Sequence, residues 1–125
     1  MSTPLSIMIV EDQQDITHLY RLHLARLGID SIIFANPLIA LDHFQRNHGR
    51  YALILLDLTL PTMNGLELAK RMRKINSKVH ILLITGYPVK DMVYDDDFRE
   101  AKISQVLQKP IRFEDLGPRI IKLCA

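Results

Sequence analysis

The stretch YALILLDLTLPTMNGLEL, residues 51–68, places a single carboxylate, Asp57, after a run of apolar residues. The run shows no alternation of polar and apolar positions, so it predicts a strand over residues 51–58 that is buried on both faces. A buried strand gives a rigid support to the residue at its end. We therefore expect Asp57 to be held at the tip of this strand and to be open to an incoming reactant.

Four more apolar stretches predict strands over residues 5–10, 31–35, 80–85 and 103–108. Segments with helical periodicity separate the strands. These segments lie between residues 11 and 28, from residue 37 onward, and over residues 66–75, 88–101 and 113–124. Strands that alternate with helices are typical of a parallel sheet covered on both faces, so an α/β fold is predicted.

The helices carry more specific expectations. The first should stop at Gly28 and bury one face, formed by Ile16, Leu19, Tyr20, Leu24 and Leu27. The second should begin with Asn36 as its N-cap and Pro37 at its first position.

Two later helices are atypical. The segment over residues 88–101 starts an apolar face that three aspartates, residues 95–97, interrupt, so it should be short, irregular or mobile. The aspartates are expected to form a solvated cap for a short helical turn. In the last helix, Gly117 and Pro118 are expected to trim the helix, because proline is tolerated only in a first turn.

Length and composition limit the class of protein. The 125 residues predict a single domain over residues 1–125, with 48% hydrophobic and 24% charged residues, as in ordinary globular domains. The lone Cys124 forms no internal disulfide, and no basic leader or membrane-length apolar run is present, so a cytoplasmic location is expected. The net charge of +2 does not indicate nucleic acid binding. The basic run KRMRK, residues 70–74, is expected to be a solvated helix face.

Polar residues follow the strands at the edge where an open parallel sheet binds its ligands. The residues at these strand ends are Glu11, Asp12, Asp57, Thr85 and Lys109. Three carboxylates at one edge repel one another, so a bound cation or a lysine must compensate their charge. Oxygen ligands suit Mg²⁺, which binds one or two carboxylates and keeps several waters.

Together these groups predict a phosphoryl-transfer site. Asp57 would be the acceptor, Mg²⁺ and Lys109 would neutralise charge, and Thr85 would supply a hydroxyl group. Each residue also has a simpler interpretation. Glu11 and Asp12 could cap the first helix, Thr85 could bond to backbone, and Lys109 could be solvated. The site is favoured because the residues occur as a set, in order, on successive strands.

The same residues resemble the receiver domain of two-component response regulators, the CheY-like family. The resemblance rests on Glu11-Asp12, on Thr85-Gly86, on Lys109-Pro110, and on DLTLPTMNG (57–65), which matches the family pattern Asp-x-x-x-Pro-x-x-x-Gly. It covers essentially the whole chain. It implies a flavodoxin-like fold, a doubly wound five-stranded parallel sheet in the order 2-1-3-4-5 with five helices.

The resemblance also implies a mechanism. Asp57 accepts a phosphoryl group from the phosphohistidine of a sensor histidine kinase or a histidine phosphotransfer protein. Lys109, joined to Pro110 by a cis peptide bond, contacts the phosphoryl group, and Thr85 moves toward it. The implied ligands of Mg²⁺ are Glu11, Asp12, Asp57 and the backbone carbonyl of Thr59.

The family further implies the partners and the kind of output. The face formed by the fourth helix, the fifth strand and the fifth helix would meet an output domain or a partner protein. Nucleic acid would be bound only through a separate output domain. The chain would catalyse its own phosphoryl transfer and dephosphorylation without being a turnover enzyme on another substrate.

This sequence departs from the family at one position that matters for signalling. Many receivers carry Tyr or Phe three residues before the site lysine, where this chain has Val106. Tyr87, two residues after Thr85, could take part instead or could shield the phosphoryl group from water.

Two alternative functions remain open. One is a receiver-fold scaffold that binds partners without phosphorylation. The other is a phosphohydrolase with Asp57 as its covalent nucleophile. Haloacid-dehalogenase-like enzymes normally have a second aspartate where this chain has Thr59, and the chain has no cap domain.

Overall fold

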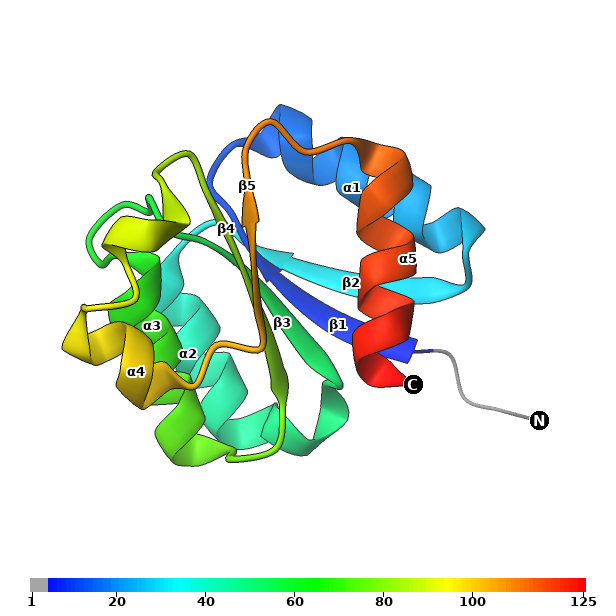
Figure 1. Cartoon of the computed structure of the whole chain (residues 1–125). Helices are drawn as coiled ribbons and strands as arrows, with labels where there is room; N and C mark the ends of the chain where they lie inside the picture. Colours follow the sequence, from blue (N-terminus) through cyan, green and yellow to red (C-terminus); the bar gives the residue numbers. More distant parts are fainter. Residues whose placement is uncertain (1–4) are drawn as a thin grey trace.

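Five parallel strands form one sheet in the order β2-β1-β3-β4-β5 in the computed structural model, which describes residues 5–125 (Figure 1). The strands are β1 Leu5–Val10, β2 Ile29–Phe34, β3 Leu53–Asp57, β4 His80–Thr85 and β5 Gln105–Gln108. Every neighbouring pair is parallel, so each connection crosses over the sheet. The predicted doubly wound α/β fold and its strand order are confirmed.

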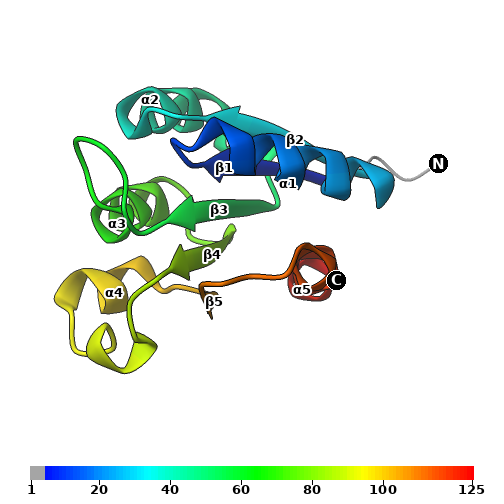
Figure 2. The ribbon, with the colours of Figure 1, turned by 90° about the horizontal axis from the view of Figure 1, so that it is seen from above.

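Helices cover both faces of this sheet. They are α1 Gln14–Arg26, α2 Pro37–Asn47, α3 Gly65–Ile75, α4 Asp96–Ala101 and α5 Phe113–Cys124, with short 3-10 turns η1 His48–Arg50 and η2 Val89–Asp91. Figure 2 shows α1 and α5 on one side of the sheet and α2, α3 and α4 on the other. None of the helices in residues 5–125 has the length and apolar character needed to cross a bilayer.

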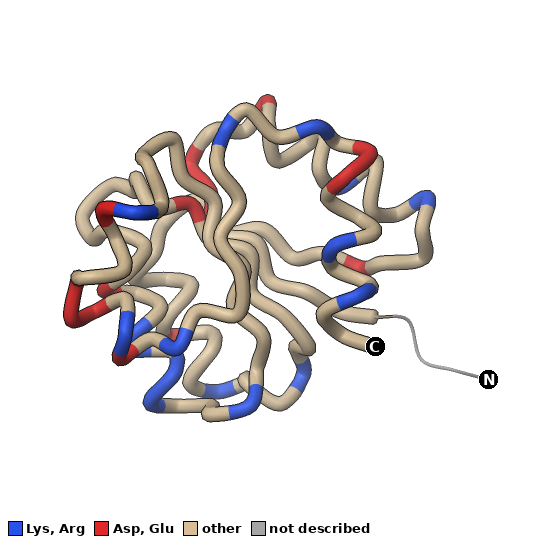
Figure 3. Tube along the Cα trace, viewed as in Figure 1, with Lys and Arg blue, Asp and Glu red and all other residues tan. Residues whose placement is uncertain are grey.

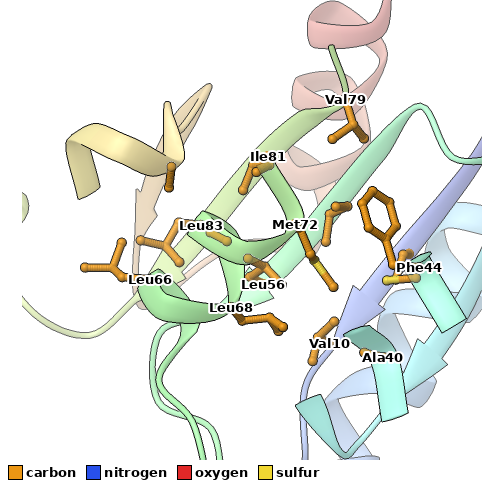
Figure 4. Packing of buried hydrophobic residues seen from close by; sticks show 14 of the residues in the cluster. Val10, Ala40, Phe44, Leu56, Leu66, Leu68, Met72, Val79, Ile81 and Leu83 are labelled. Atoms are coloured by element: carbon orange, nitrogen blue, oxygen red, sulfur yellow. The ribbon is translucent and has the colours of Figure 1, made fainter. Parts of the chain in front are cut away.

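The central strand β3 contributes to two cores. Its residues alternate, so Ile54 and Leu56 pack toward α2 and α3, whereas Leu53 and Leu55 pack toward α1 and α5. Figure 4 shows Leu56 among the side chains of the first of these cores. All four side chains are at most 1% exposed. Burial of each such side chain contributes about 1.5–3 kcal/mol, so β3 is a firm support for the residue at its tip.

Three predicted strands have wrong boundaries. β2 begins two residues earlier than predicted, at Ile29, because the exposed Asp30 in this edge strand interrupts the apolar run that marked the strand. β3 begins at Leu53 instead of residue 51, because η1 ends at Arg50 and Tyr51 is its C-cap residue. β5 begins at Gln105 instead of residue 103.

The buried face of α1 was only partly predicted. Tyr20 and Leu24 are buried as expected, but Leu19 is 48% exposed and Leu27 is 45% exposed. Leu19 is adjacent to Tyr20 in sequence and so lies about 100° around the helix from it. Leu27 stands beyond the end of α1 as its C-cap residue, just before Gly28.

Both helix starts with a predicted cap agree with the structure. The Asn36 side chain accepts a hydrogen bond from the Leu38 amide at the start of α2, with Pro37 at the first helical position. The expected irregular segment over 88–101 is confirmed as η2 followed by the six-residue α4. Asp95 caps α4 by accepting from the Asp97 amide at 2.8 Å.

The final helix was predicted wrongly. α5 runs without a break through Gly117 and Pro118. Pro118 removes only one backbone donor, whereas Leu116 and Ile120 on the same helix are completely buried. A side chain on Gly117 would overlap Leu27, so glycine lets α5 lie close against the end of α1. Tertiary packing therefore outweighs the local cost of the proline.

The loop between β3 and α3 contains a strained turn that the sequence analysis missed. Thr62 has a φ of 66°, and the Met63 amide donates to the Pro61 carbonyl at 2.7 Å across it. A γ-turn with a positive central φ is rare, and a β-branched residue in this conformation is a strong outlier. The loop that follows Asp57 therefore carries backbone strain.

We expect Thr62→Gly to raise the free energy of unfolding by about 1 kcal/mol, because glycine adopts positive φ without a steric penalty. Thr62→Ala is the matched control, since it removes the side chain but keeps a Cβ. Urea denaturation of the three proteins measures the difference. A Gly variant that is no more stable than the Ala variant would show that the turn is not strained.

We expect Gly65→Ala to lower the free energy of unfolding by about 1–3 kcal/mol. The Gly65 amide donates to the Leu58 carbonyl at 2.8 Å, and a Cβ would overlap the Asp57 carbonyl and lie 2.9 Å from Leu58 Cα. These neighbours are backbone atoms, so α3 would have to shift. Gly49→Ala, where a Cβ meets no atom within 4 Å, is the control in the same denaturation experiment. Equal stability of the two variants would contradict the close approach.

Candidate functional site

Residues that follow β1 and β3 lie level with each other at the carboxyl edge of the sheet. The parallel register aligns Val10 of β1 with Leu56 of β3. The next residues along the two chains are Glu11 and Asp57. Both side chains are buried, with Glu11 6% and Asp57 5% exposed. Two buried carboxyl groups therefore stand side by side at the centre of this edge.

The lysine that follows β5 reaches the same place. The Lys109 amide donates to the Thr85 carbonyl at 2.7 Å, which fixes the start of the β5–α5 loop to the end of β4. The Lys109 side chain then extends past β4, and its Nζ donates to Asp57 Oδ2 at 2.7 Å. The predicted cis peptide bond between Lys109 and Pro110 is present.

The carboxylate of Asp57 is engaged at both oxygens. Lys109 binds Oδ2, and the Thr59 amide donates to Oδ1 at 2.9 Å. The Asp57 side chain is only 6% exposed, whereas that of Lys109 is 35% exposed. The prediction that this carboxylate is open is therefore wrong: the ammonium group and the loop backbone cover it. Each of the two oxygens thus already has a hydrogen-bond donor in this structure.

The two neighbouring acids have opposite pKa shifts. The pKa of Glu11 is raised to about 8, first by burial and then by the hydrogen bond and the negative charge of Asp57. For Asp57, burial favours a higher pKa, but hydrogen bonds from Glu11, Lys109 and the Thr59 amide outweigh it, and the pKa is lowered. Asp57 is therefore the ionised member of the pair at neutral pH, and Glu11 is mainly protonated.

In the part of the chain that the structure describes, the side chains of two other predicted site residues, Asp12 and Thr85, form no hydrogen bond with the side chains of Asp57 and Lys109. Asp12 is exposed next to Glu11. Thr85 is completely buried, and its Oγ1 accepts a hydrogen bond from the Tyr87 amide at 2.9 Å. Within residues 5–125, no three His, Cys, Asp or Glu side chains are grouped closely enough to hold a metal ion. The structure thus brings Glu11, Asp57 and Lys109 together but leaves Asp12 and the Thr85 hydroxyl outside this group.

The donor set nevertheless fits Mg²⁺. This ion is usually bound by one or two carboxylates and keeps several waters, so the Glu11–Asp57 pair suffices as its protein anchor. Burial, and then the neighbouring Asp57, raise the pKa of Glu11, so a cation beside the pair would favour the ionised form of Glu11. The exposed Asp12 and Thr59, in the loops after β1 and β3, lie where solvent-side oxygens can be added.

Tyr20 is a site neighbour that the sequence analysis treated as core. It is 6% exposed and packs edge-on against Phe113, with ring centroids 5.5 Å apart. Its pKa is raised to about 12 by burial and then by the negative charges of Glu11 and Asp57. Together with Lys109 it lines a pocket of about 490 Å³. The sequence did offer a signal for this role, because Tyr20 is the one aromatic residue on a predicted helix face that is otherwise aliphatic.

Comparison with known proteins gives a family match over most of the chain. The family model described as the response regulator receiver domain matches residues 7–121. The response regulator receiver protein CpdR of Brucella abortus is 32% identical, and the alignment covers 94% of each chain. The sporulation initiation phosphotransferase F of Bacillus subtilis is 35% identical over 93% of this chain and 90% of its own length.

Another relative is longer than this chain. The uncharacterized transcriptional regulatory protein YkoG of Bacillus subtilis is 34% identical over 91% of this chain. The alignment covers 48% of YkoG, so the chain spans about half the length of this relative. By contrast, it spans nearly all of CpdR and of phosphotransferase F.

Solved structures agree with the fold. A CheY-like receiver domain from Methanospirillum hungatei superposes with a TM-score of 0.86 over 97% of this chain and 94% of its own, at 24% identity. The response regulator TrrA of Thermotoga maritima, solved in complex with Mg²⁺ and BeF, is 28% identical, with a TM-score of 0.80 over 95% of this chain and 98% of its own. With the family match over residues 7–121, these findings show that the chain belongs to the receiver domains of two-component response regulators.

Proposed function

We propose that this chain is a phosphoacceptor receiver whose Asp57 takes a phosphoryl group from a phosphohistidine. The donor would be a sensor histidine kinase or a histidine phosphotransfer protein. The observation that carries the proposal is the contact of Lys109 Nζ with Asp57 Oδ2 at 2.7 Å, next to the buried Glu11. An ionised acceptor, a lysine cation and a second acid at one strand edge suit phosphoryl transfer, which depends on positioning and on neutralisation of charge.

In the proposed reaction, an oxygen of Asp57 forms a bond to phosphorus while the bond from phosphorus to the histidine nitrogen breaks. The imidazole leaves with that electron pair and takes up a proton. Asp57 is suited to attack because its lowered pKa keeps it ionised. Burial alone would lower the pKa of Lys109, but the hydrogen bond and charge of Asp57 raise it, so Lys109 stays cationic and can pass from the carboxylate to a phosphoryl oxygen.

Mg²⁺ is the cofactor that this site would hold, through Glu11, Asp12, Asp57 and the backbone carbonyl of Thr59. When bound, Mg²⁺ would neutralise negative charge on the transferred group and on the acids around it. The residues of the chain divide the remaining work. Glu11 would hold a cation in its deprotonated form, Lys109 would leave Asp57 Oδ2, and the Thr59 amide would continue to orient Asp57 through Oδ1.

The conformational response would begin at Thr85. Its Oγ1 accepts from the Tyr87 amide, so a movement of the hydroxyl group to donate to a phosphoryl oxygen would shift or break this bond and loosen the turn after β4. Val106 on β5 has no aromatic ring to follow this movement. We propose that the change passes into the segment of η2 and α4, and so to a partner on the face of α4, β5 and α5. The proposed setting is a cytoplasmic signalling chain that acts as a switch and not as a turnover enzyme.

One observation supports the alternative of a receiver-fold scaffold that signals without phosphorylation. The Asp57 side chain is only 6% exposed and is bonded to Lys109. If Lys109 never released the carboxylate, Asp57 would be a structural group. The phosphorylation experiment below separates these two functions.

We expect wild-type protein incubated with Mg²⁺ and a small phosphodonor such as acetyl phosphate to gain one phosphoryl group, measured by intact mass. Asp57→Ala should show complete loss of this gain. Asp30→Ala removes an exposed aspartate at the start of β2, at the other end of the strands, and should react like wild type. Chelation of Mg²⁺ should also abolish the reaction. No gain in wild type, or an equal gain in Asp57→Ala, would favour the scaffold.

We expect Tyr87→Ala to shorten the lifetime of phosphorylated Asp57, because Tyr87 lines the groove that contains Thr59 and Asn64 and its ring would shield the phosphoryl group from water. Tyr94→Ala is the matched control: Tyr94 lies in the same connection but is 82% exposed. Loss of the phosphate mass with time, after removal of the phosphodonor, gives the lifetime. Equal lifetimes for wild type and Tyr87→Ala would count against shielding.

A further inference from the structure

Three loops at the amino ends of the strands are tied into one surface. The Asn76 side chain lies 3.2 Å from His48 Nδ1, which joins the α3–β4 loop to η1. Arg73 donates to the Val79 carbonyl at 2.6 Å and to the Lys102 carbonyl at 3.1 Å, which joins the same loop to the α4–β5 connection. We call the surface formed by residues 48–50, 74–79 and 102–104 the amino-end face.

Arg73 provides a fixed charge below this face. It is 9% exposed, and its guanidinium bonds only to backbone carbonyls among residues 5–125, those of Asn76, Val79, Ala101 and Lys102. The prediction that KRMRK is a solvated face is therefore wrong for Arg73. The prediction is also wrong for Lys70, whose side chain is 25% exposed and forms an ion pair with Asp97 at 2.7 Å.

The amino-end face is cationic and contains no acid. It exposes Arg50, Lys74, Lys78 and Lys102, and none of these forms an ion pair within residues 5–125. The segments that form it, residues 48–50, 74–79 and 102–104, contain no Asp or Glu. Figure 3 shows basic segments along this lower end of the trace, whereas acidic segments gather beside α4 and at the upper edge.

Helix stabilisation explains only part of this charge. Lys74 lies in the last turn of α3 and Lys102 is the C-cap of α4, where a cation interacts favourably with the helix dipole. Arg50 ends the 3-10 turn η1, and Lys78 lies in the loop after α3. These two have no α-helix end to stabilise, although the loops hold them next to the other cations. The four cations are therefore available to an anionic partner.

The charges around the face favour a short acidic segment over a long nucleic acid. The net charge of the chain is only +2. The exposed carboxylates Asp96 and Glu100 stand on α4, beside the face. A duplex is anionic along its whole length, so it would extend over these carboxylates and be repelled. A peptide segment with a few glutamates or aspartates fits within the basic area.

We propose that the amino-end face is a docking surface for an acidic segment of a partner protein. The face lies at the ends of the strands opposite Asp57, so it can be occupied while the phosphoacceptor site reacts. The inference does not depend on the proposed phosphorylation. It rests on the four unpaired cations, the buried Arg73 and the absence of acids in the segments that form the face.

Binding of fluorescent poly-L-glutamate to the unphosphorylated chain tests this inference. The test variant is R50Q/K74Q/K78Q/K102Q. The control variant, R21Q/R26Q/R119Q/K122Q, removes four exposed cations on α1 and α5 that also lack an ion pair within residues 5–125, and so makes the same change in net charge. The double variant R50Q/K78Q changes no residue of an α-helix, so it still tests the face if the fourfold test variant fails to fold. Circular dichroism checks the fold of each protein.

We expect wild type to bind poly-L-glutamate, with affinity that falls as salt rises, because the face is exposed to solvent. The test variant should lose about tenfold or more in affinity, R50Q/K78Q should lose an intermediate amount, and the control should lose less than about threefold. No binding by wild type, or equal losses in the test and control variants, would overturn the proposal. Tighter binding of short duplex DNA than of poly-L-glutamate at the same face would overturn it in favour of nucleic acid.

Discussion

The contact between Lys109 and Asp57 depends on the whole topology of the sheet. Asp57 stands at the end of β3 and Lys109 follows β5, with β4 between them. The lysine side chain spans this strand to reach the carboxylate at 2.7 Å. On the other side, β1 places Glu11 beside the same acid. The crossover that puts β1 next to β3 therefore assembles a site from segments almost 100 residues apart in the sequence.

Because Asp57 is buried, its charge depends on the hydrogen bonds that it accepts. A carboxylate that is 6% exposed is stable as an anion only with donors at both oxygens, and Lys109 and the Thr59 amide provide them. The same arrangement leaves Glu11 protonated next to Asp57. A phosphoryl group on Asp57 could thus take over the hydrogen bond from Lys109, and a cation could take the place of the proton on Glu11.

Rigid contacts extend from this tip into the helices. Gly65 packs α3 against the backbone of Asp57 and Leu58. At its other end, α3 holds the short α4 through Lys70 with Asp97 and Arg73 with the Ala101 carbonyl at 2.9 Å. The connection between Thr85 and α4 exposes Tyr87 and Tyr94 to solvent. This difference is why the proposed response is assigned to that connection.

The sequence predicted the parts of this molecule that local patterns determine. Apolar runs located the strands, and Asn36, Pro37 and Asp95 marked helix starts, because each acts on its own neighbourhood. The continuity of α5 through Pro118 depends on its packing against α1. A tertiary contact of this kind cannot be inferred from the residues next to the proline. Site membership was predicted for Glu11, Asp57 and Lys109 from strand ends. The closure of Lys109 over Asp57, the turn of Thr85 toward Tyr87 and the strain at Thr62 arise from three-dimensional contacts between loops.

The central claim is that Lys109 can leave Asp57 and bind the group that Asp57 accepts. A crystal structure of the chain with Mg²⁺ and beryllofluoride, a mimic of the phosphoryl group, tests it most directly. The account predicts the beryllium on an Asp57 oxygen, with Lys109 Nζ on a fluoride and no longer on the carboxylate. A structure in which beryllofluoride binds elsewhere, or in which Lys109 still covers Asp57 at saturating ligand, would contradict it.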